Sequence, residues 1–369
     1  MREGWEYKTI EKCTSIEYGT RVVQKRDGGT IYPVYGGGGE TFRMDRYNRE
    51  DCLIIARFAM SPRCVRYVAG KFFLNDSGLS VKSKEELEQA YLNYHLLFFN
   101  DVIYHLGKGA AQRNLDVKAF RQLVIAIPPK STQLSIVSEL DNLNELIRIK
   151  KEQLKDYDTL AQSIFYEMFG DPVVNEKGWE MKTLGHICEI TSSKRVFANE
   201  YVDTGVPFYR SKEVIEKSKQ LPISVELYIS ESHYNKIKSS FGVPQIGDIL
   251  VTAVGTIGKI WVVDTNEPFY FKDGNLVWLR NIKGAHCEYF RYSLFYLIDE
   301  YKKVNANGAA YNALTIAKLK LMLCPLPPLS LQQSFAQKIE QIEQQKAAIQ
   351  KTITDLETLL AARMQYWFD

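Results

Sequence analysis

Two stretches of the chain combine a seven-residue apolar repeat with a complete absence of glycine and proline. The first covers residues 131–168, and the second, residues 331–369, keeps the same register 199 positions later. Their apolar seam positions include Leu140, Ile147, Leu154, Ile339, Ile353 and Leu360. Seams of this length are typical of coiled-coil packing rather than of a generic amphipathic helix. The pattern predicts two long spacer helices, residues 131–170 and 331–369.

Both helices belong to one chain, so the simplest arrangement is an intramolecular antiparallel pair. A dimerisation arm between two chains is the alternative. Lys150 and Lys346 each interrupt a seam near the helix middle. A polar seam residue can set the register, but we expect these two amines to extend into solvent.

The rest of the sequence contains two copies of a similar segment. Residues 4–10 (GWEYKTI) recur as residues 178–184 (GWEMKTL), and residues 127–129 (IPP) recur as residues 326–328 (LPP). Between these borders, residues 109–111 (GAA) recur as residues 308–310. The offset grows from 174 to 199, so the second copy has the longer middle. Several matches in the same order indicate an internal duplication.

The two middles combine strand and helix patterns. Residues 65–68, 249–254 and 260–263 are rich in β-branched side chains and predict strands, with a glycine turn at residues 255–258. Residues 84–99 and 289–301 predict helices. We therefore expect an α+β fold: domains of mixed α/β structure at residues 1–130 and 171–330, separated by two long antiparallel coiled-coil helices in a pseudo-twofold internal repeat.

Charge and cysteine content add little to this picture. The net charge is +3, and residues 1–130 hold 20 basic and 15 acidic side chains. Such a mild excess is compatible with phosphate binding but does not establish it. The six cysteines stand singly, which argues against a zinc site or a disulfide scaffold. With no signal peptide or membrane segment in the sequence, we expect a cytoplasmic protein.

Catalytic motifs are missing from the sequence. There is no Asn-Pro-Pro-aromatic tetrapeptide of the amino-methyltransferase kind and no phosphate-binding loop, since the glycine run 36–39 is followed by Glu40. The five histidines have no metal-ligand spacing, and Asp248 with Lys259 does not form a convincing nuclease pair. We expect a non-catalytic chain.

The motifs in their order resemble those of type I restriction-modification specificity subunits. They are the two GWExKT[IL] openings, the two [IL]PP closings, residues 165–172 (FYEMFGDP), residues 32–37 (YPVYGG) and residues 247–250 (GDIL). The resemblance covers essentially the whole chain. One departure is that the sequence ends at Asp369, directly after the second helix, whereas some members carry a further tail.

The resemblance implies a function and a set of partners. Two target recognition domains would each read one half of a bipartite site on double-stranded DNA, and the helices would act as a spacer. Two methyltransferase subunits would bind this chain, and restriction subunits would join them. S-adenosylmethionine, ATP and magnesium would belong to those partners, with no cofactor on this chain and no membrane contact.

Candidate DNA-contacting residues were chosen by type and clustering. Base edges are read mainly by Arg, Lys, Asn and Gln, while Ser, Thr and Tyr also reach phosphates. The candidates in the first domain are Arg43, Arg46, Tyr47, Asn48 and Arg49. Those in the second are Lys194, Arg195, Tyr209, Arg210, Ser211, Lys212, Thr256 and Lys259. Any one of them could instead be a solvated surface residue. Tyr47 and Tyr311 could support distorted DNA around an extruded base.

Two other classes of protein remain as alternatives. One is a nuclease or methyltransferase with an unrecognised site, against which the missing motifs count. The other is an architectural coiled-coil protein that binds any duplex alike. The two copies of the duplicated segment match at their ends but differ between them, which counts against a purely architectural protein.

Overall fold

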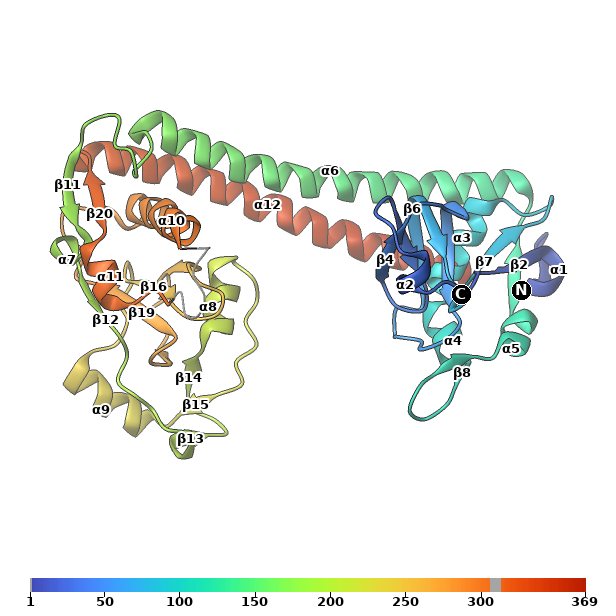
Figure 1. Ribbon diagram of the computed structural model, residues 1–369, viewed down its shortest axis with the longest axis horizontal. Coiled ribbons are helices and arrows are strands. Elements are labelled where there is room, and N and C mark those ends of the chain that lie inside the picture. Colours follow the sequence, from blue (N-terminus) through green and yellow to red (C-terminus); the bar gives the residue numbers. More distant parts are fainter. Residues whose placement is uncertain (1, 306–312) are drawn as a thin grey trace. The chain divides into compact units, whose positions relative to one another are not determined.

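The computed structural model describes residues 2–305 and 313–369, and these form two compact units (Figure 1). Unit 1 comprises residues 1–152 and 349–369, and unit 2 comprises residues 153–348. Each long helix contributes one segment to each unit. The second copy of the GAA motif, residues 308–310, and the candidate Tyr311 lie outside the described residues.

The duplication is visible in a frame of short elements that both units share. In unit 1, β1 (Glu6–Thr9) pairs antiparallel with β10 (Val124–Ile127), so that Glu6 faces Ile127. In unit 2, β11 (Glu180–Thr183) pairs with β20 (Leu323–Leu326), so that Glu180 faces Leu326. In each unit a short helix follows the first strand of this pair: α1 (Ile10–Cys13) in unit 1 and α7 (Leu184–Ile187) in unit 2. A second short helix precedes the second strand of the pair: α5 (Val117–Gln122) in unit 1 and α11 (Ile316–Leu321) in unit 2.

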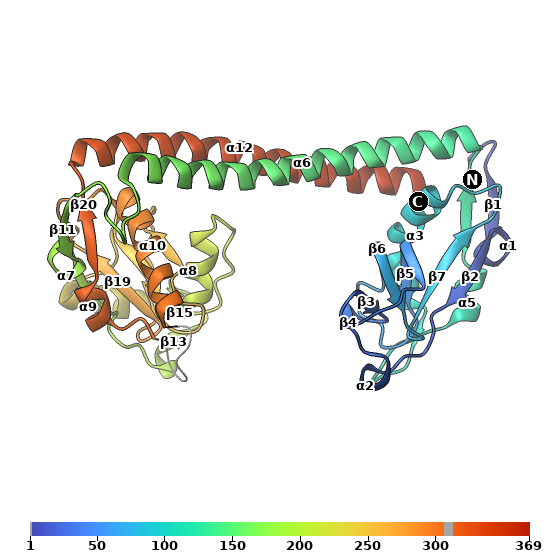
Figure 2. The same ribbon diagram turned by 45° about the horizontal axis from the view of Figure 1, so that its top comes forward.

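Each frame carries an equivalent antiparallel sheet. In unit 1 the order β2-β7-β5-β6 is built from β2 (Thr14–Tyr18), β7 (Gly78–Ser83), β5 (Arg49–Ala56) and β6 (Val65–Leu74) (Figure 2). In unit 2 the order β12-β19-β16-β17 is built from β12 (Glu189–Thr191), β19 (Leu276–Arg280), β16 (Ile249–Thr252) and β17 (Ile260–Val262). The strands predicted at residues 65–68, 249–254 and 260–263 lie in these two sheets.

Beyond these four strands the two units diverge. Unit 1 continues the same sheet with β3 (Tyr32–Tyr35), parallel to β6, and then β4 (Glu40–Met44). Unit 2 instead has a separate sheet, β13 (Tyr201–Val202), β15 (Tyr228–Ile229), β14 (Val206–Tyr209) and β18 (Tyr270–Phe271). Helices α8 (Ser211–Ser218) and α9 (Glu231–Phe241) accompany it, whereas unit 1 has the short α2 (Gln24–Asp27). Unit 1 also contains α4 (Asn100–His105) and the hairpin β8–β9 (Gly107–Lys108 and Asn114–Leu115); the residues of unit 2 that correspond to this hairpin lie largely outside the described residues.

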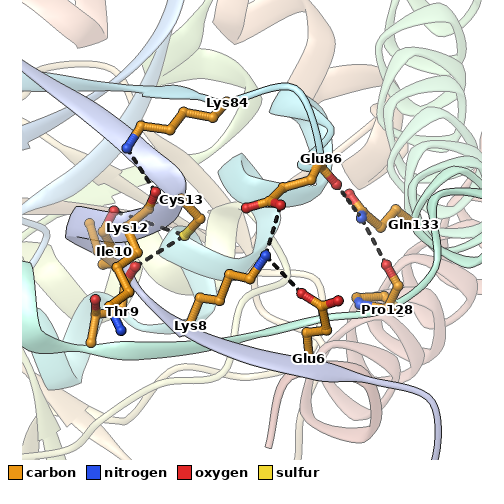
Figure 3. A network of polar contacts seen from close by, with 10 residues as sticks. All are labelled: Glu6, Lys8, Thr9, Ile10, Lys12, Cys13, Lys84, Glu86, Pro128 and Gln133. Atoms are coloured by element: carbon orange, nitrogen blue, oxygen red, sulfur yellow. Dashed lines mark hydrogen bonds and ion pairs between the residues drawn. The ribbon is translucent and has the colours of Figure 1, made fainter.

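A buried glutamine fixes the start of each long helix. Gln133, in α6 (Lys130–Phe169), has no exposed surface; its amide nitrogen donates to the carbonyls of Glu86 and Pro128, and its oxygen accepts from the Glu88 N–H (Figure 3). Gln332, in α12 (Leu329–Phe368), makes the same three kinds of bond in unit 2. Buried amides with all partners satisfied fix a unique local arrangement.

The same contacts explain a wrong boundary in our prediction. The helix expected from residue 84 begins only at Gln89 and runs to Phe98 (α3), because the Glu88 N–H bonds to Gln133 and the Lys84 N–H bonds to the carbonyl of Cys13. Figure 3 also shows Lys84 reaching the Lys12 carbonyl, and Lys8 between Glu6 and Glu86. In unit 2 the counterpart of α3 is α10 (Cys287–Val304), which includes the helix predicted at residues 289–301.

The long helices pair antiparallel within each unit. In unit 1, Glu139 pairs with Arg363 and Lys151 pairs with Glu357, so the numbers fall along α12 as they rise along α6. In unit 2, Asp158 pairs with Lys346 at 2.8 Å, and Phe165 packs on Phe335. The contacts are intramolecular, as the simpler of our two interpretations required.

The seam positions lie on the inner faces of these segments. Leu140, Ile147, Ile339 and Ile353 are buried, and Leu154 and Leu360 are half-buried. Lys346 corrects one expectation. Its side chain is 23% exposed and ion-pairs with Asp158 and Glu343, so its amine is held at the helix interface and does not extend freely into solvent.

Candidate nucleic-acid interface

The first candidate cluster follows strand β4 and contains both exposed and engaged side chains. Arg43 is half exposed and contacts the Glu40 carboxylate at 3.1 Å and the Ile31 carbonyl at 3.0 Å. The Arg46 guanidinium lies 5.7 Å from the centre of the Phe73 ring. Tyr47 is exposed, with the Lys71 amine 4.7 Å from its ring centre. These three side chains remain available to an external ligand.

Asn48 and Arg49 are committed to the fold of unit 1. The Asn48 amide makes two hydrogen bonds to the backbone of Leu74, at 3.0 and 2.7 Å. The Arg49 side chain is 15% exposed and contacts the Ser80 hydroxyl at 2.9 Å and Glu17 at 3.3 Å. Their polar groups join β5 to its neighbours, so they fit a structural role better than the base contacts we expected.

Tyr209 is the clearest correction in the second cluster. Its side chain is 5% exposed and stacks on Phe269 with ring centres 4.8 Å apart, inside an aromatic core with Trp261. Burial raises the pKa of its hydroxyl to about 12. Because only 5% of its surface is exposed, this tyrosine belongs to the core of unit 2 and its ring is not available for a direct DNA contact.

The charges that follow Tyr209 are neutralised by carboxylates. Arg210 contacts the buried Glu213 at 2.9 Å and Glu226 at 2.8 Å, and the Lys212 amine lies 2.6 Å from Glu226. These two cations hold the pKa of the Glu226 carboxyl at about 2. Ser211 has a buried hydroxyl without a hydrogen-bond partner. DNA phosphates would have to compete with two carboxylates here, which weakens the case for this cluster.

Lys194 and Arg195 lie on the loop between β12 and the 3-10 turn η1 (Ala198–Glu200). The Lys194 amine lies 4.7 Å from the centre of the Phe241 ring. Arg195 is 66% exposed and pairs with Asp273 at 2.7 Å. Among the described residues, Lys194 therefore has no carboxylate partner, whereas Arg195 is paired with Asp273.

Thr256 and Lys259 lie on the turn between β16 and β17. The Thr252 hydroxyl donates to the Thr256 carbonyl, and the Lys259 N–H donates to the Thr252 hydroxyl at 2.9 Å, which closes the turn. Both candidate side chains are exposed. Lys259 has no ion-pair partner among the described residues.

Unit 1 has an equivalent turn that our sequence analysis did not single out. The Ala56 N–H donates to the Cys64 carbonyl at 2.8 Å, as the Thr252 N–H donates to the Lys259 carbonyl at 3.0 Å. The Leu115 N–H donates a hydrogen bond to the Arg57 carbonyl in unit 1, and the Leu314 N–H donates one to the Ala253 carbonyl in unit 2. The turn at residues 57–63 therefore matches the turn at residues 253–258. The repeated GAA motif with its following leucine was the signal that could have located it.

A pocket in unit 2 adjoins the GDIL motif. It has a volume of about 630 Å³ and is lined by Gln245, Trp278 and Arg280 among others. Asp248 accepts hydrogen bonds from the Gln245 N–H at 2.9 Å and the Trp278 indole at 2.8 Å, and burial raises the pKa of its carboxyl. The aspartate closes a turn at the start of β16 and is thus structural.

Metal and membrane sites were also sought. Among the described residues, no three His, Cys, Asp or Glu side chains lie where they could hold a metal ion. Of the helices in residues 2–305 and 313–369, none carries an apolar run of the length needed to span a bilayer.

Two copies of one frame, each carrying its own sheet and followed by a long helix, define a modular protein of two similar domains, and a family model matches each copy. Residues 3–156 and 176–358 each match the type I restriction modification DNA specificity domain. The chain belongs to this family, whose named relatives are non-catalytic specificity subunits.

Individual relatives support this membership along most of the chain. A type I restriction enzyme specificity subunit of Haemophilus influenzae is 27% identical over 350 residues, covering 92% of this chain and 87% of its own. The MjaVIII specificity subunit of Methanocaldococcus jannaschii is 24% identical over 307 residues, covering 74% of this chain and 70% of its own.

Two solved structures share the fold. The type I restriction-modification S subunit from M. genitalium has a TM-score of 0.57 at 17% identity, covering 99% of this chain and 96% of its own. A chain from a study of complex assembly and conformational transition in a type I system has a TM-score of 0.60 at 19% identity, covering 99% of this chain and 97% of its own.

Proposed function

We propose that this chain selects the DNA sequence that a type I restriction-modification complex modifies, with each unit reading one half of a bipartite target. The observation that carries the proposal is the contrast between a repeated frame and unlike additions to it. The strands β1–β10 and β11–β20 match in register, whereas the strands beyond the four-stranded sheets differ in number and order. Two readers with a common attachment and different surfaces suit a target with two different halves.

We further propose that the chain is the scaffold for two methyltransferase subunits and for restriction subunits. The related chain of known structure comes from a study of how a type I complex assembles, and this supports a role in assembly. S-adenosylmethionine, ATP and magnesium would act on those partner subunits. The complex would work on double-stranded DNA in the cytoplasm, without membrane contact.

The DNA-facing residues within each unit belong to this proposal. Arg43, Arg46 and Tyr47 in unit 1, and Lys194, Thr256 and Lys259 in unit 2, have side chains that an external phosphate or base could reach. Arginine and lysine contribute both phosphate contacts and guanine recognition.

Long-read methylation mapping tests the function directly. The chain would be co-expressed with its genomically adjacent methyltransferase, and DNA from these cells would be compared with DNA from cells that express the methyltransferase alone. We expect a chain-dependent split motif, two short specified parts around a fixed unspecified gap. Methylation that does not depend on the chain, or that falls on one uninterrupted motif, would contradict the two-reader proposal.

The alternative of a catalytic chain has its own measurement. The purified chain alone, incubated with duplex DNA and S-adenosylmethionine or magnesium, should neither methylate nor cut it. Modification by the isolated chain would restore the enzyme hypothesis.

A further inference from the structure

Unit 1 carries four arginines on three neighbouring segments, and we name them the arginine surface. They are Arg57 and Arg63 on the β5–β6 turn, Arg66 on β6, and Arg113 before β9. Backbone contacts join the segments. The Met60 N–H donates to the Arg113 carbonyl at 2.9 Å, and the Leu115 N–H donates to the Arg57 carbonyl at 2.9 Å. The four cations therefore lie on one continuous part of unit 1.

The glycine run at residues 36–39 packs against this turn. A Cβ atom at Gly37 would lie 2.0 Å from the Phe58 carbonyl oxygen, so only glycine permits this approach. The Gly37 carbonyl in turn accepts a hydrogen bond from the Arg66 guanidinium at 2.8 Å. The run, which matched no phosphate-loop motif, thus has a structural purpose beside the arginines.

The four arginines of the arginine surface lack counter-ions. Arg43 pairs with Glu40 and Arg49 with Glu17, but no ion pair joins any of the four surface arginines to a carboxylate in the described chain, a property that they share with Arg2, Arg21 and Arg46. Arg66 is half-buried, and among the described residues the carbonyls of Gly37 and Arg63 are its hydrogen-bond partners. A cation that loses water without gaining a carboxylate is unfavourable, and an anionic ligand would relieve that cost.

Aromatic rings hold two of the guanidinium groups in place. Arg57 lies 4.9 Å from the centre of the Tyr18 ring and 4.5 Å from that of Phe58, and Arg113 lies 4.7 Å from that of Tyr104. Stacking restrains a planar guanidinium while its N–H donors remain available. Less conformational entropy is then lost when a ligand binds.

The matching turn in unit 2 carries Thr256 and the unpaired Lys259. Both units therefore present cationic side chains at the same place in the same four-stranded sheet. Elsewhere the candidates are not equivalent, since β4 in unit 1 and the residues after β14 in unit 2 belong to the divergent parts. A position shared by two readers is the expected location of a shared ligand.

We propose that the arginine surface is the main DNA contact of unit 1, with the β16–β17 turn as its counterpart in unit 2. The inference rests on the proposed function and deepens it, because it moves the reading residues from Arg43–Arg49 to Arg57, Arg63, Arg66 and Arg113. The ligand is the phosphate backbone of duplex DNA together with guanine edges, which arginine recognises bidentately.

The test uses the complex of the full chain with its methyltransferase. Arg63 is the first target, because it is exposed and its side chain has no partner among the described residues whose loss would disturb folding. The variants are Arg63→Ala, Arg63→Gln, Arg57→Ala and Arg57→Lys. Arg43→Ala probes the earlier candidate cluster, and Arg26→Ala, at an exposed arginine paired with Asp27, is the matched control. Dissociation constants would be measured by fluorescence anisotropy over a range of salt, with a duplex carrying the mapped motif and an unrelated duplex of equal length.

We expect Arg63→Ala and Arg63→Gln to weaken binding about tenfold and the control Arg26→Ala to change it less than about twofold. If Arg63 contacts a phosphate, the slope of log K against log salt should fall by about one, for both duplexes. If Arg63 recognises guanine, only the affinity for the duplex with the motif should fall. Arg57→Lys keeps the charge and should weaken binding less than Arg57→Ala.

Two outcomes would overturn the assignment. Unchanged binding of both duplexes by the Arg63 variants, with a loss in Arg43→Ala, would return the contact to Arg43–Arg49. Loss of methyltransferase from the complex in size-exclusion chromatography, with DNA binding unchanged, would make the surface a protein contact. The unrelated duplex keeps the test valid if mapping finds no split motif. A split motif with normal Arg63 variants would refute only this inference.

Discussion

In unit 1 the last turns of α12 pack on aromatic rings through Phe368 and are also held by an ion pair and stacked cations, whereas in unit 2 the last turns of α6 are held mainly by packed aromatic rings. Arg363 donates to both carboxylate oxygens of Glu139, and the Trp367 indole donates to one of them at 3.1 Å. In unit 2, Phe165 contacts Phe169, Tyr289 and Phe335 at ring-centre distances of 5.2 to 5.8 Å.

The difference shows which parts of a duplicated protein are constrained. Moved by 199 positions, Arg363 corresponds to Ile164 and Glu139 to Lys338, so the pair exists in one copy only. Phe368 and Phe169, which also correspond, both enter the core of their units. Both α6 and α12 therefore end in a buried phenylalanine. The ion pair between Glu139 and Arg363 that helps to fix the last turns of α12 has no equivalent at the corresponding positions of the other copy.

The largest effect is expected from Phe165→Ala. This side chain has no exposed surface and contacts five other aromatic rings besides Phe169. Its loss should lower the free energy of unfolding of unit 2 by about 3–5 kcal/mol. Peptide-resolved hydrogen exchange would measure this unit separately from unit 1. Phe295→Ala, at a 45% exposed phenylalanine, is the control and should cost clearly less. Equal losses would mean that the aromatic cluster does not hold the helix end.

Gln133→Ala and Gln332→Ala test what the two units share. Each substitution leaves one N–H and two carbonyls in the frame without their partner. We expect a loss of about 2–3 kcal/mol in the unit that carries the change, with similar values for both. Hydrogen exchange at the start of α6 or α12 is the measurement. A large inequality between the two variants would show that the frames are not energetically equivalent.

Glu139→Gln should give a smaller, pH-dependent loss in unit 1. The Arg363 guanidinium, with help from Trp367, lowers the pKa of the Glu139 carboxyl. A lowered pKa adds stability that is present above the unfolded-state pKa and is lost as pH falls through the folded-state value. With both side chains about a third exposed, we expect about 0.5–1 kcal/mol at pH 7. In urea unfolding, the difference from the unsubstituted chain should disappear in acid; a constant difference would exclude ionisation as its cause.

Lys346→Met should have the smallest effect. The lysine is 23% exposed at the seam and pairs with Asp158 and Glu343. An apolar residue of similar length gains packing and avoids desolvating a charge, so we expect a change between zero and about 1 kcal/mol of added stability. Thermal unfolding is sufficient to measure it, with exposed Lys351→Met as the control. A loss above about 1 kcal/mol would show that the ion pair fixes the register of the helices.

The frame could be predicted because its signals are local and repeated. Heptads, the GWExKT[IL] openings and the [IL]PP closings mark the helices and their paired strands without knowledge of tertiary contacts. The start of α3 could not be predicted, since Gln133, 44 positions beyond Gln89, binds the backbone that would otherwise form its first turn.

The candidate site was less predictable because residue type does not reveal burial or pairing. Tyr209 is buried against Phe269, some 60 residues later in the chain. Arg210 and Arg63 look alike in sequence, but Glu213 and Glu226 neutralise the first. The equivalence of the turns at residues 57–63 and 253–258 emerged only from their matching hydrogen bonds.

One feature of unit 1 has a practical consequence for labelling. Trp5 stacks on Trp367 with ring centres 6.5 Å apart, and the Arg2 guanidinium lies against both rings and against Tyr366. An affinity tag or fluorophore added at either end of the chain would therefore emerge beside this stack. A reporter at either end of the chain would therefore report on unit 1. Unit 2 is better labelled at an internal surface position.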